Sequence, residues 1–196
     1  MIRAFIAATL APAVVEEIAK VRTTLQEAKG DIRWTRIEGV HLTLKFLGDL
    51  ARTQVEPILA TLTETLRERP PLLLLAQGLG GFPTLKRPRV VWVGIKGEGL
   101  SELSETIETA LVPLDFPPEE RPFTPHLTLG RVRSLRGWEQ VLAVVKAYEH
   151  VRFGESMVSA VTLYQSELRP EGAVYRPLGI VSLGIFSQGA KPHGER

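Results

Sequence analysis

The stretch HLTLKFLG, at residues 41–48, is nearly repeated as HLTLGR at residues 126–131. The chain has 196 residues and only four histidines, and two of them open the same His-Leu-Thr-Leu tetrapeptide. Each copy alternates polar and apolar residues, which is the pattern of a half-buried β-strand. Because about half the chain separates the copies, we expect two similar lobes that each contribute one such strand.

Helical and extended patterns alternate around the two copies. We expect helices over about 12–28, 53–66, 100–111 and 134–145, and further strands over about 3–10, 72–78, 89–95, 157–165 and 175–183. Short loops between neighbouring strands favour antiparallel pairing, so the fold class predicted is α+β rather than a doubly wound parallel sheet. We expect one bilobal domain over residues 1–186, with two pseudo-symmetric lobes that each hold an antiparallel sheet and helices. The polar residues 187–196 lack periodicity and are expected to form a disordered tail.

The apolar start of the chain allows two interpretations. Residues 1–15 carry an early arginine, an apolar run and small residues, as a short secretory signal does. The rival is a buried strand followed by a helix that begins at Pro12. A helical stripe of Val14, Ile18, Val21 and Leu25 runs on through the region where a signal would be cleaved, and this favours the strand and helix.

Composition limits the classes of function. The 44% apolar and 23% charged residues are those of an ordinary globular protein, and the net charge of +2 permits an anionic ligand. The absence of cysteine excludes disulfides, thiolate metal sites and a cysteine nucleophile. It also fits a reducing compartment, so we expect a cytoplasmic protein. No apolar run reaches the ~18 residues needed to cross a bilayer, so no membrane partner is expected.

The repeated tetrapeptide places an imidazole beside a hydroxyl in each copy. In a strand, His41 and Thr43 share one face, about two residues or roughly 7 Å apart, and the leucines share the other. His126 and Thr128 are arranged in the same way. Imidazole titrates near neutrality and serves as a general acid or base, while a hydroxyl donates hydrogen bonds to an oxyanion.

Two such pairs suit in-line displacement at phosphorus. That reaction needs a base beside the attacking oxygen and an acid beside the leaving oxygen, on opposite sides of the phosphorus atom. Histidines from opposite lobes meet this requirement without a metal ion, and each acid or base group is typically worth about 10²–10⁴-fold in rate. The threonine hydroxyls would hold the non-bridging oxygens, whose charge grows toward the transition state.

At these residues the chain resembles the 2H phosphoesterase superfamily, which has paired His-x-Thr/Ser-x motifs. The resemblance is closest to the RNA 2′,3′-cyclic phosphodiesterase branch, historically called 2′-5′ RNA ligases. It extends through RAFIA at residues 3–7, Trp34, GGFPTLKRPRVVWVGI at residues 80–95, FTPHLTLGR at residues 123–131, and LYQSEL at residues 163–168 followed by Gly172 and Tyr175. It therefore covers nearly the whole chain apart from the tail.

The resemblance implies a cleft between two lobes and a reaction without metal or cofactor. Family members open an RNA-terminal 2′,3′-cyclic phosphate to a 2′-phosphomonoester, and they join or cleave 2′-5′ linkages in substrates that resemble tRNA halves. By this resemblance His41 is the proton donor to the departing 3′-oxygen and His126 is the acceptor that activates water. Thr43 and Thr128 would bind phosphate oxygens. The likeness of the two motifs makes the donor and acceptor roles reversible on the sequence alone. RNA is the expected partner, and a monomer is the expected state.

Four further residues are candidates for substrate binding: Lys45, Phe82, Phe123 and Arg131. Lys45 is expected on the face of the first histidine, where its ammonium would either meet a phosphate or reach solvent. Strict alternation places Arg131 on the face opposite the second histidine, but a bulge at the preceding glycine would turn its guanidinium into the cleft. The family pattern also has an arginine there. Phe82 and Phe123 are expected on loops beside the motif strands, where they would stack a base, whereas Trp92 fits the core at least as well.

Other interpretations stay open. His150 and His193 lack the motif and are expected to be structural or solvent-exposed. A metal hydrolase built on the two motif histidines would add a third ligand at a telling spacing, and none is evident. A non-catalytic protein that binds RNA ends or nucleotides would keep the same pocket. Within the superfamily, a relative that acts on ADP-ribose cyclic phosphate or on U-tailed RNA is a further alternative.

Overall fold

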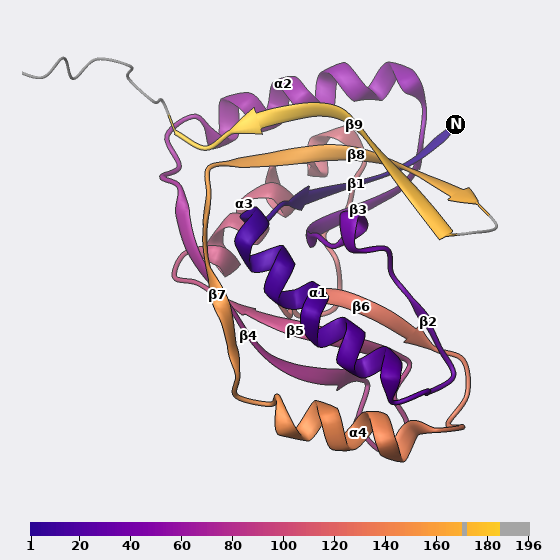
Figure 1. Ribbon diagram of the computed structural model, residues 1–196. Coiled ribbons are helices and arrows are strands. Elements are labelled where there is room, and N and C mark those ends of the chain that lie inside the picture. The colour runs from indigo at the N-terminus through magenta and orange to yellow at the C-terminus, as the bar shows by residue number, and fades with distance from the viewer. Residues whose placement is uncertain (170–171, 185–196) are drawn as a thin grey trace, which may run out of the picture.

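The structure is a computed structural model that describes residues 1–169 and 172–184 (Figure 1). In chain order its strands and α-helices are β1 (Ile2–Ala8), α1 (Pro12–Glu27), β2 (Ile32–Trp34), β3 (Leu42–Leu50), α2 (Val55–Leu66), β4 (Leu72–Phe82), β5 (Val90–Lys96), α3 (Leu100–Ala110), β6 (His126–Val132), α4 (Trp138–Ala147), β7 (Arg152–Val158), β8 (Ala160–Arg169) and β9 (Gly172–Ser182). The expected α+β class is confirmed. The expected tail over residues 187–196 lies outside the described residues.

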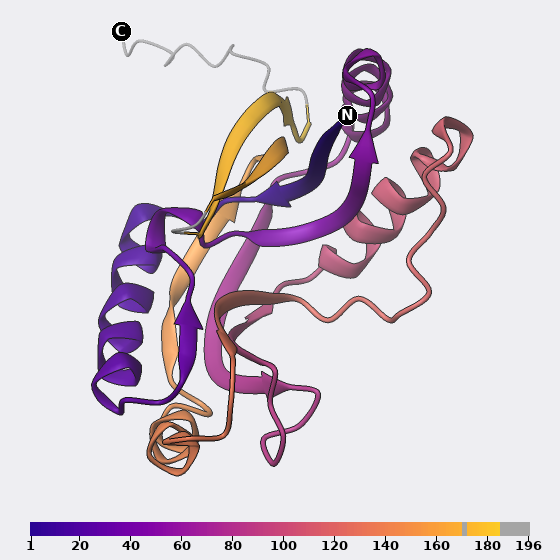
Figure 2. The same cartoon turned by 90° about the vertical axis from the view of Figure 1, so that its right-hand side faces the viewer.

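The strands form one curled antiparallel sheet made of two similar halves (Figure 2). The first half has the order β3-β1-β8-β9, and the second has the order β7-β4-β5-β6 with β2 paired to β6. The halves join where β3 meets β6, through the pair Leu42–Leu127. The two HLTL strands are therefore the central strands of the sheet, antiparallel to each other. The expected single strand over residues 157–165 is wrong, because the extended segment is interrupted at Ser159 and its two parts, β7 and β8, belong to different halves.

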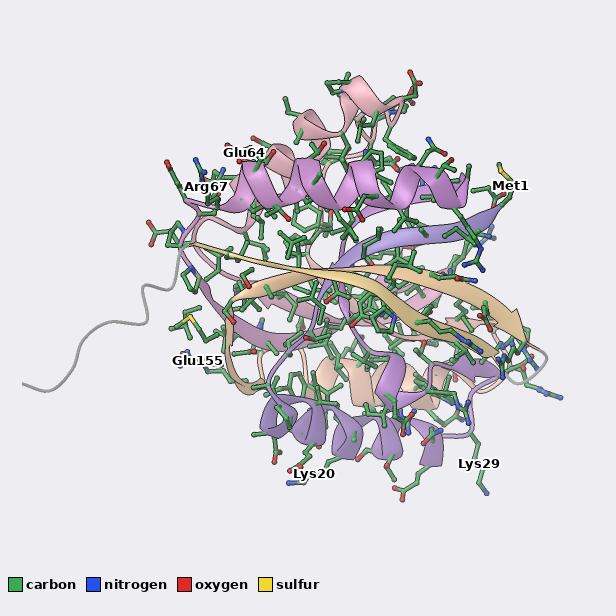
Figure 3. The ribbon with its side chains drawn as sticks, turned by 90° about the horizontal axis from the view of Figure 1, so that it is seen from above. Met1, Lys20, Lys29, Glu64, Arg67 and Glu155 are labelled. Atoms are coloured by element: carbon green, nitrogen blue, oxygen red, sulfur yellow. The ribbon has the colours of Figure 1, made fainter. Side chains whose placement is uncertain are left out.

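The helices cover the apolar face of each half. Helices α1 and α4 pack beside β7 and β4, whereas α2 and α3 pack beside β9 and β3. Their buried stripes and the two central leucines, Leu42 and Leu127, belong to the same hydrophobic core. The opposite helix faces are charged, and Lys20 of α1 and Glu64 of α2 point outward in Figure 3. The helices thus occupy the leucine face of the motif strands and leave the histidine face to other groups.

The apolar start of the chain is a strand of this sheet. β1 pairs with both β3 and β8, and Ile2, Ala4 and Ile6 enter the core. The strand and helix expected there are confirmed. Across residues 1–169 and 172–184, every helix is too short or too polar to serve as a membrane span.

Both motif strands carry a β-bulge at the last leucine of the tetrapeptide. The register of β3 against β1 skips Leu44, and the register of β6 against β5 skips Leu129. A bulge adds one residue to one strand, so the residues beyond it point to the face opposite to the one that strict alternation gives. Lys45 therefore turns toward the core, and Arg131 turns to the face of His126.

Candidate active site

Four polar side chains meet at the junction between the two half-sheets: His41, Thr43, His126 and Thr128. The junction pair, Leu42 and Leu127, is fully buried on the core face. Because neighbouring residues of a strand alternate between faces, the polar side chains beside these leucines lie on the other face. Continued in antiparallel register, the pair sets each histidine opposite the threonine of the other motif. The predicted approach of the two motifs is therefore realised, and all four side chains are half-buried.

The two histidines are held by the same local hydrogen bond. Nδ1 of His41 lies 2.7 Å from the carbonyl oxygen of Gly39, and Nδ1 of His126 lies 2.7 Å from that of Thr124. A carbonyl oxygen only accepts, so in both rings Nδ1–H is the donor. The remaining nitrogen, Nε2, is then the one that gains or loses a proton. Each motif thus presents the same ring nitrogen for acid–base chemistry.

Aromatic rings surround His41. Phe5 of β1 stacks on it with ring centroids 4.6 Å apart, and Tyr175 of β9 meets it edge-on at 4.9 Å. Tyr164 of β8 stacks on Phe5 at 5.4 Å and also lies near His41, with ring centroids 6.3 Å apart. Burial lowers the pKa of His41, and the hydrogen bond to the Gly39 carbonyl partly opposes this effect. His41 is therefore enclosed by aromatic residues from three strands of the first half-sheet, β1, β8 and β9.

The second histidine has a phenylalanine at its side. Phe82, at the end of β4, meets His126 edge-on with ring centroids 4.9 Å apart. Trp92 lies next to Phe82 at 5.2 Å and covers Gly80, where an added Cβ atom would overlap the indole. Phe82 thus lies beside the motif as expected, although it is the last residue of β4 and not part of a loop. Phe123 is half-buried and packs at the margin of the core, with no ring contact to a histidine among the described residues.

The structure corrects the expectation for Lys45. The residue is only 4% exposed and lies on the core face, where Nζ donates to Glu108 Oε2 of α3 and to the carbonyl oxygen of Pro117 at 2.8 Å. The expectation that Lys45 shares the face of His41 is wrong, because the bulge at Leu44 reverses the alternation. Its charge serves a buried ion pair between β3 and α3 instead.

The structure places Arg131 on the histidine face. The bulge lets Gly130 pair with Val91 on the core side, so Arg131, paired with Val90, is exposed. Burial raises the pKa of Tyr175, and the positive charge of the nearby Arg131 opposes that rise. The guanidinium of Arg131 thus belongs to the same strand and the same face as His126 and Thr128. The irregularity that would turn Arg131 into the cleft is present one residue before the expected glycine.

Sequence reasoning missed the aromatic wall of His41. Phe5, Tyr164 and Tyr175 were not among the candidate site residues, although all three fall in or beside stretches that carry the family resemblance. Strict alternation places Phe5 on the face of β1 opposite to Ala4 and Ile6. Only the pairing of β1 with β3 shows that this face is the one that carries the site. The alternation in the sequence therefore identified a distinct face of β1 without showing what that face meets.

The other described histidine and the described acidic groups form no metal-binding cluster. His150 is exposed after α4, and His193 lies outside the described residues. Over residues 1–169 and 172–184, no three His, Asp or Glu side chains gather as ligands of a metal ion would.

Facing His-x-Thr-x strands at the junction of two antiparallel half-sheets define a 2H phosphoesterase. The family model described as the 2′-5′ RNA ligase superfamily matches residues 10–169. The chain therefore belongs to the 2′-5′ RNA ligase superfamily, and the expectation of a 2H phosphoesterase enzyme is confirmed.

Individual relatives match over nearly their whole length. A protein of Methanothermobacter thermautotrophicus named RNA 2′,3′-cyclic phosphodiesterase is 32% identical over 183 residues, which is 93% of this chain and 99% of the relative. A protein of the same name from Aeropyrum pernix is 32% identical over 84% of this chain and 94% of its own length. Among solved structures, a Thermus thermophilus protein superposes with a TM-score of 0.79 at 29% identity, covering 92% of this chain and 97% of that protein. E. coli LigT in complex with 3′-AMP superposes with a TM-score of 0.73 at 27% identity, covering 93% and 98%.

Proposed function

We propose that this chain hydrolyses 2′,3′-cyclic phosphates at the ends of RNA to 2′-phosphomonoesters. The observation that carries the proposal is the pair of histidines, His41 and His126, each with Nδ1–H held by a carbonyl and Nε2 left to exchange protons. Relatives named RNA 2′,3′-cyclic phosphodiesterase support the choice of substrate. The solved complex of E. coli LigT with 3′-AMP supports a nucleotide in the cleft.

The proposed chemistry is one in-line displacement. Nε2 of His126 accepts a proton from water as the water oxygen attacks phosphorus. The bond from phosphorus to O3′ breaks, and Nε2–H of His41 donates a proton to O3′, so the phosphate stays on the 2′ oxygen. Thr43 and Thr128, whose hydroxyls have no hydrogen-bond partner within the described part of the chain, would donate to the non-bridging oxygens together with Arg131. Proton exchange with solvent then restores both histidines.

The proposal extends to the second reaction expected of the family. If the 5′-hydroxyl of another RNA replaces water as the nucleophile, the product is a 2′-5′ linkage, and the reverse step cleaves it. Ligation is therefore part of the proposal as the same displacement with a different attacking oxygen. Monomeric action and a cytoplasmic location remain predictions.

The first test is the identity of the product. Incubation with a short RNA that ends in a 2′,3′-cyclic phosphate is expected to yield the 2′-phosphomonoester, which chromatography or phosphorus NMR separates from the 3′ isomer. Excess EDTA should leave the rate unchanged, because the two histidines and no metal move the protons. A 3′-phosphate product, or loss of turnover with EDTA, would refute the mechanism and return the metal hydrolase to consideration.

The rival functions predict other results in the same assay. A non-catalytic RNA-end binder would hold the 2′-phosphate product tightly and release no product from the cyclic substrate. A relative specialised for ADP-ribose cyclic phosphate would turn over that compound much faster than the RNA, and one specialised for U-tailed RNA would require terminal uridines. A substrate panel of these compounds separates the alternatives.

The pH dependence tests the acid–base pair. kcat/KM should be bell-shaped, since one histidine must be protonated and the other neutral. Burial disfavours the imidazolium of His41, so its pKa in the free protein should be lower than that of a histidine in a model peptide. A lowered pKa by itself favours neutral His41. A phosphodiester anion beside Nε2 would stabilise the imidazolium and raise the pKa of His41 again. NMR titration of ring nitrogens with and without a 2′-nucleotide product measures both shifts. A His41 pKa that does not rise with the product would contradict the assignment of His41 as proton donor.

A further inference from the structure

A second feature of the histidine face is a basic groove that begins at Arg131. The groove encloses about 540 Å³ between the β4–β5 loop and the end of β6, and four arginines line it: Arg87, Arg89, Arg131 and Arg133. All four side chains are exposed. Within residues 1–169 and 172–184 no carboxylate lies within ion-pair distance of any of them. Within the described part of the chain, four unpaired cations thus share one groove, and the carboxylate nearest in the hydrogen-bond network, Asp31, accepts from Ser134 Oγ instead.

The groove and the candidate active site share strand β6. Arg131 lines the groove, and the bulge at Leu129 places it on the face of β6 that also carries His126 and Thr128. Arg133 follows two residues later on an extended chain, about 7 Å farther along. Arg89 lies on the neighbouring segment, where its carbonyl oxygen accepts from the backbone N–H of Val132. A chain that leaves the reacting phosphate past Arg131 would therefore meet further guanidinium groups.

The other half of the molecule has a groove of opposite charge. It follows the bulge in β3 as the basic groove follows the bulge in β6, and it encloses about 450 Å³. Four carboxylates line it, Asp49, Asp115, Glu119 and Glu120, and the one lysine there, Lys45, is paired with Glu108. In Figure 2 the β4–β5 loop lies at the bottom of the molecule, and the segment after α3 lies at its right-hand side. The two similar halves therefore differ in the charge of the grooves that follow their bulges.

We propose that the basic groove binds the phosphodiester backbone of the RNA strand that carries the cyclic phosphate, one or more nucleotides before the reacting end. Guanidinium groups match phosphate oxygens with two parallel hydrogen bonds, and charge repulsion keeps the strand out of the acidic groove. This inference rests on the proposed function and adds to it a direction for the strand and a preference for substrate length. The groove makes the enzyme favour RNA ends over mononucleoside 2′,3′-cyclic phosphates.

The test compares two substrates on the intact chain. One is a mononucleoside 2′,3′-cyclic phosphate, and the other is a short RNA with the same terminal nucleotide. The groove variant carries Arg87→Gln, Arg89→Gln and Arg133→Gln, and it leaves Arg131 in place. The control variant carries Arg52→Gln, Arg67→Gln and Arg152→Gln, which removes the same charge from exposed positions elsewhere; Arg67, for example, points outward in Figure 3.

The groove variant should lose at least about tenfold in kcat/KM on the RNA at low salt, and less than about twofold on the mononucleotide, because only the RNA carries the extra phosphates. The slope of log kcat/KM against log salt on the RNA should fall by about 2, since each phosphate contact with a single strand contributes about 0.7. The control variant should keep the wild-type preference and slope.

Three other outcomes are informative. Equal loss on both substrates would overturn the inference, because the arginines would then act on the reacting end or on the fold. Full activity of the groove variant on RNA would overturn the inference too, and it would leave the proposed function intact because the RNA end is still hydrolysed. Failure of the wild-type protein to hydrolyse either substrate would refute the proposed function, and this inference with it.

Discussion

Alanine at His41 or at His126 is expected to reduce kcat/KM for an RNA 2′,3′-cyclic phosphate by at least about 10²–10⁴-fold, the typical contribution of one acid or base group. Each ring presents Nε2 on the open face, because its Nδ1–H donates to a backbone carbonyl two residues earlier. Steady-state hydrolysis of one RNA by the two single variants measures the effect. The double variant should be little worse than either single variant, since residues that act as a unit are strongly non-additive.

The fold should survive both changes. His126 is half-buried beside Phe82, and His41 packs against Phe5 and Tyr175, so the loss of contacts at His41 should cost about 1 kcal/mol, a usual value for one substitution. For a chain of this size that cost lowers Tm by roughly 2–4 °C. His150→Ala is the matched control and should keep wild-type activity. Near-wild-type turnover by either motif variant would end the two-histidine mechanism.

Lys45→Met is expected to lower stability while leaving catalysis nearly unchanged, in contrast to the two histidine variants. Lys45 lies buried on the core face and pairs with Glu108, whose side chain is 15% exposed. Removing one partner of a buried ion pair typically costs about 3–5 kcal/mol, because the other charge is left unpaired. Glu108 keeps a hydrogen bond from the backbone N–H of Glu119, so we expect the lower end, about 3 kcal/mol. Thermal unfolding should show Tm lower by roughly 6–12 °C, with kcat/KM of the folded variant within about twofold of wild type.

A double-variant cycle distinguishes the ion pair from simple packing. Combining Lys45→Met with Glu108→Leu removes both charges together, and well-packed apolar replacements of buried ion pairs are often neutral. The double variant should therefore be more stable than Lys45→Met alone. If the two single effects simply add, the pair contributes no coupling. If Lys45→Met instead abolishes activity without loss of stability, the lysine belongs to the site after all.

The contrast between Lys45 and Arg131 shows where the sequence pattern stops being informative. Strict alternation predicted the wrong face for Lys45. It predicted that Arg131 lies in the site only if a bulge reverses the alternation. One cause explains both outcomes, since each motif strand has a bulge at the final leucine of the tetrapeptide, Leu44 or Leu129. The bulge is defined by the register against a neighbouring strand, β1 or β5, and the local pattern of polar and apolar residues does not encode that register.

The aromatic wall of His41 also depends on strand pairing that the local pattern does not encode. Phe5, Tyr164 and Tyr175 come from β1, β8 and β9, which meet beside His41 because the first half-sheet has the order β3-β1-β8-β9. These rings exclude water from His41, and the resulting burial lowers its pKa. Residue type alone does not distinguish them from core aromatics.

The amino-acid sequence by itself determined the α+β class, the strand character of the two HLTL stretches and the identity of the four polar groups that face away from their leucines. A local period of two is sufficient for that, since it depends only on neighbouring residues. The tertiary structure alone decided that Leu42 pairs with Leu127 and so brings both histidines to one face. It also decided which cations reach that face, because both outcomes depend on strand pairing between residues distant in the chain. In the proposed mechanism the repeated tetrapeptide supplies the reacting groups, and the pairing of Leu42 with Leu127 brings them together.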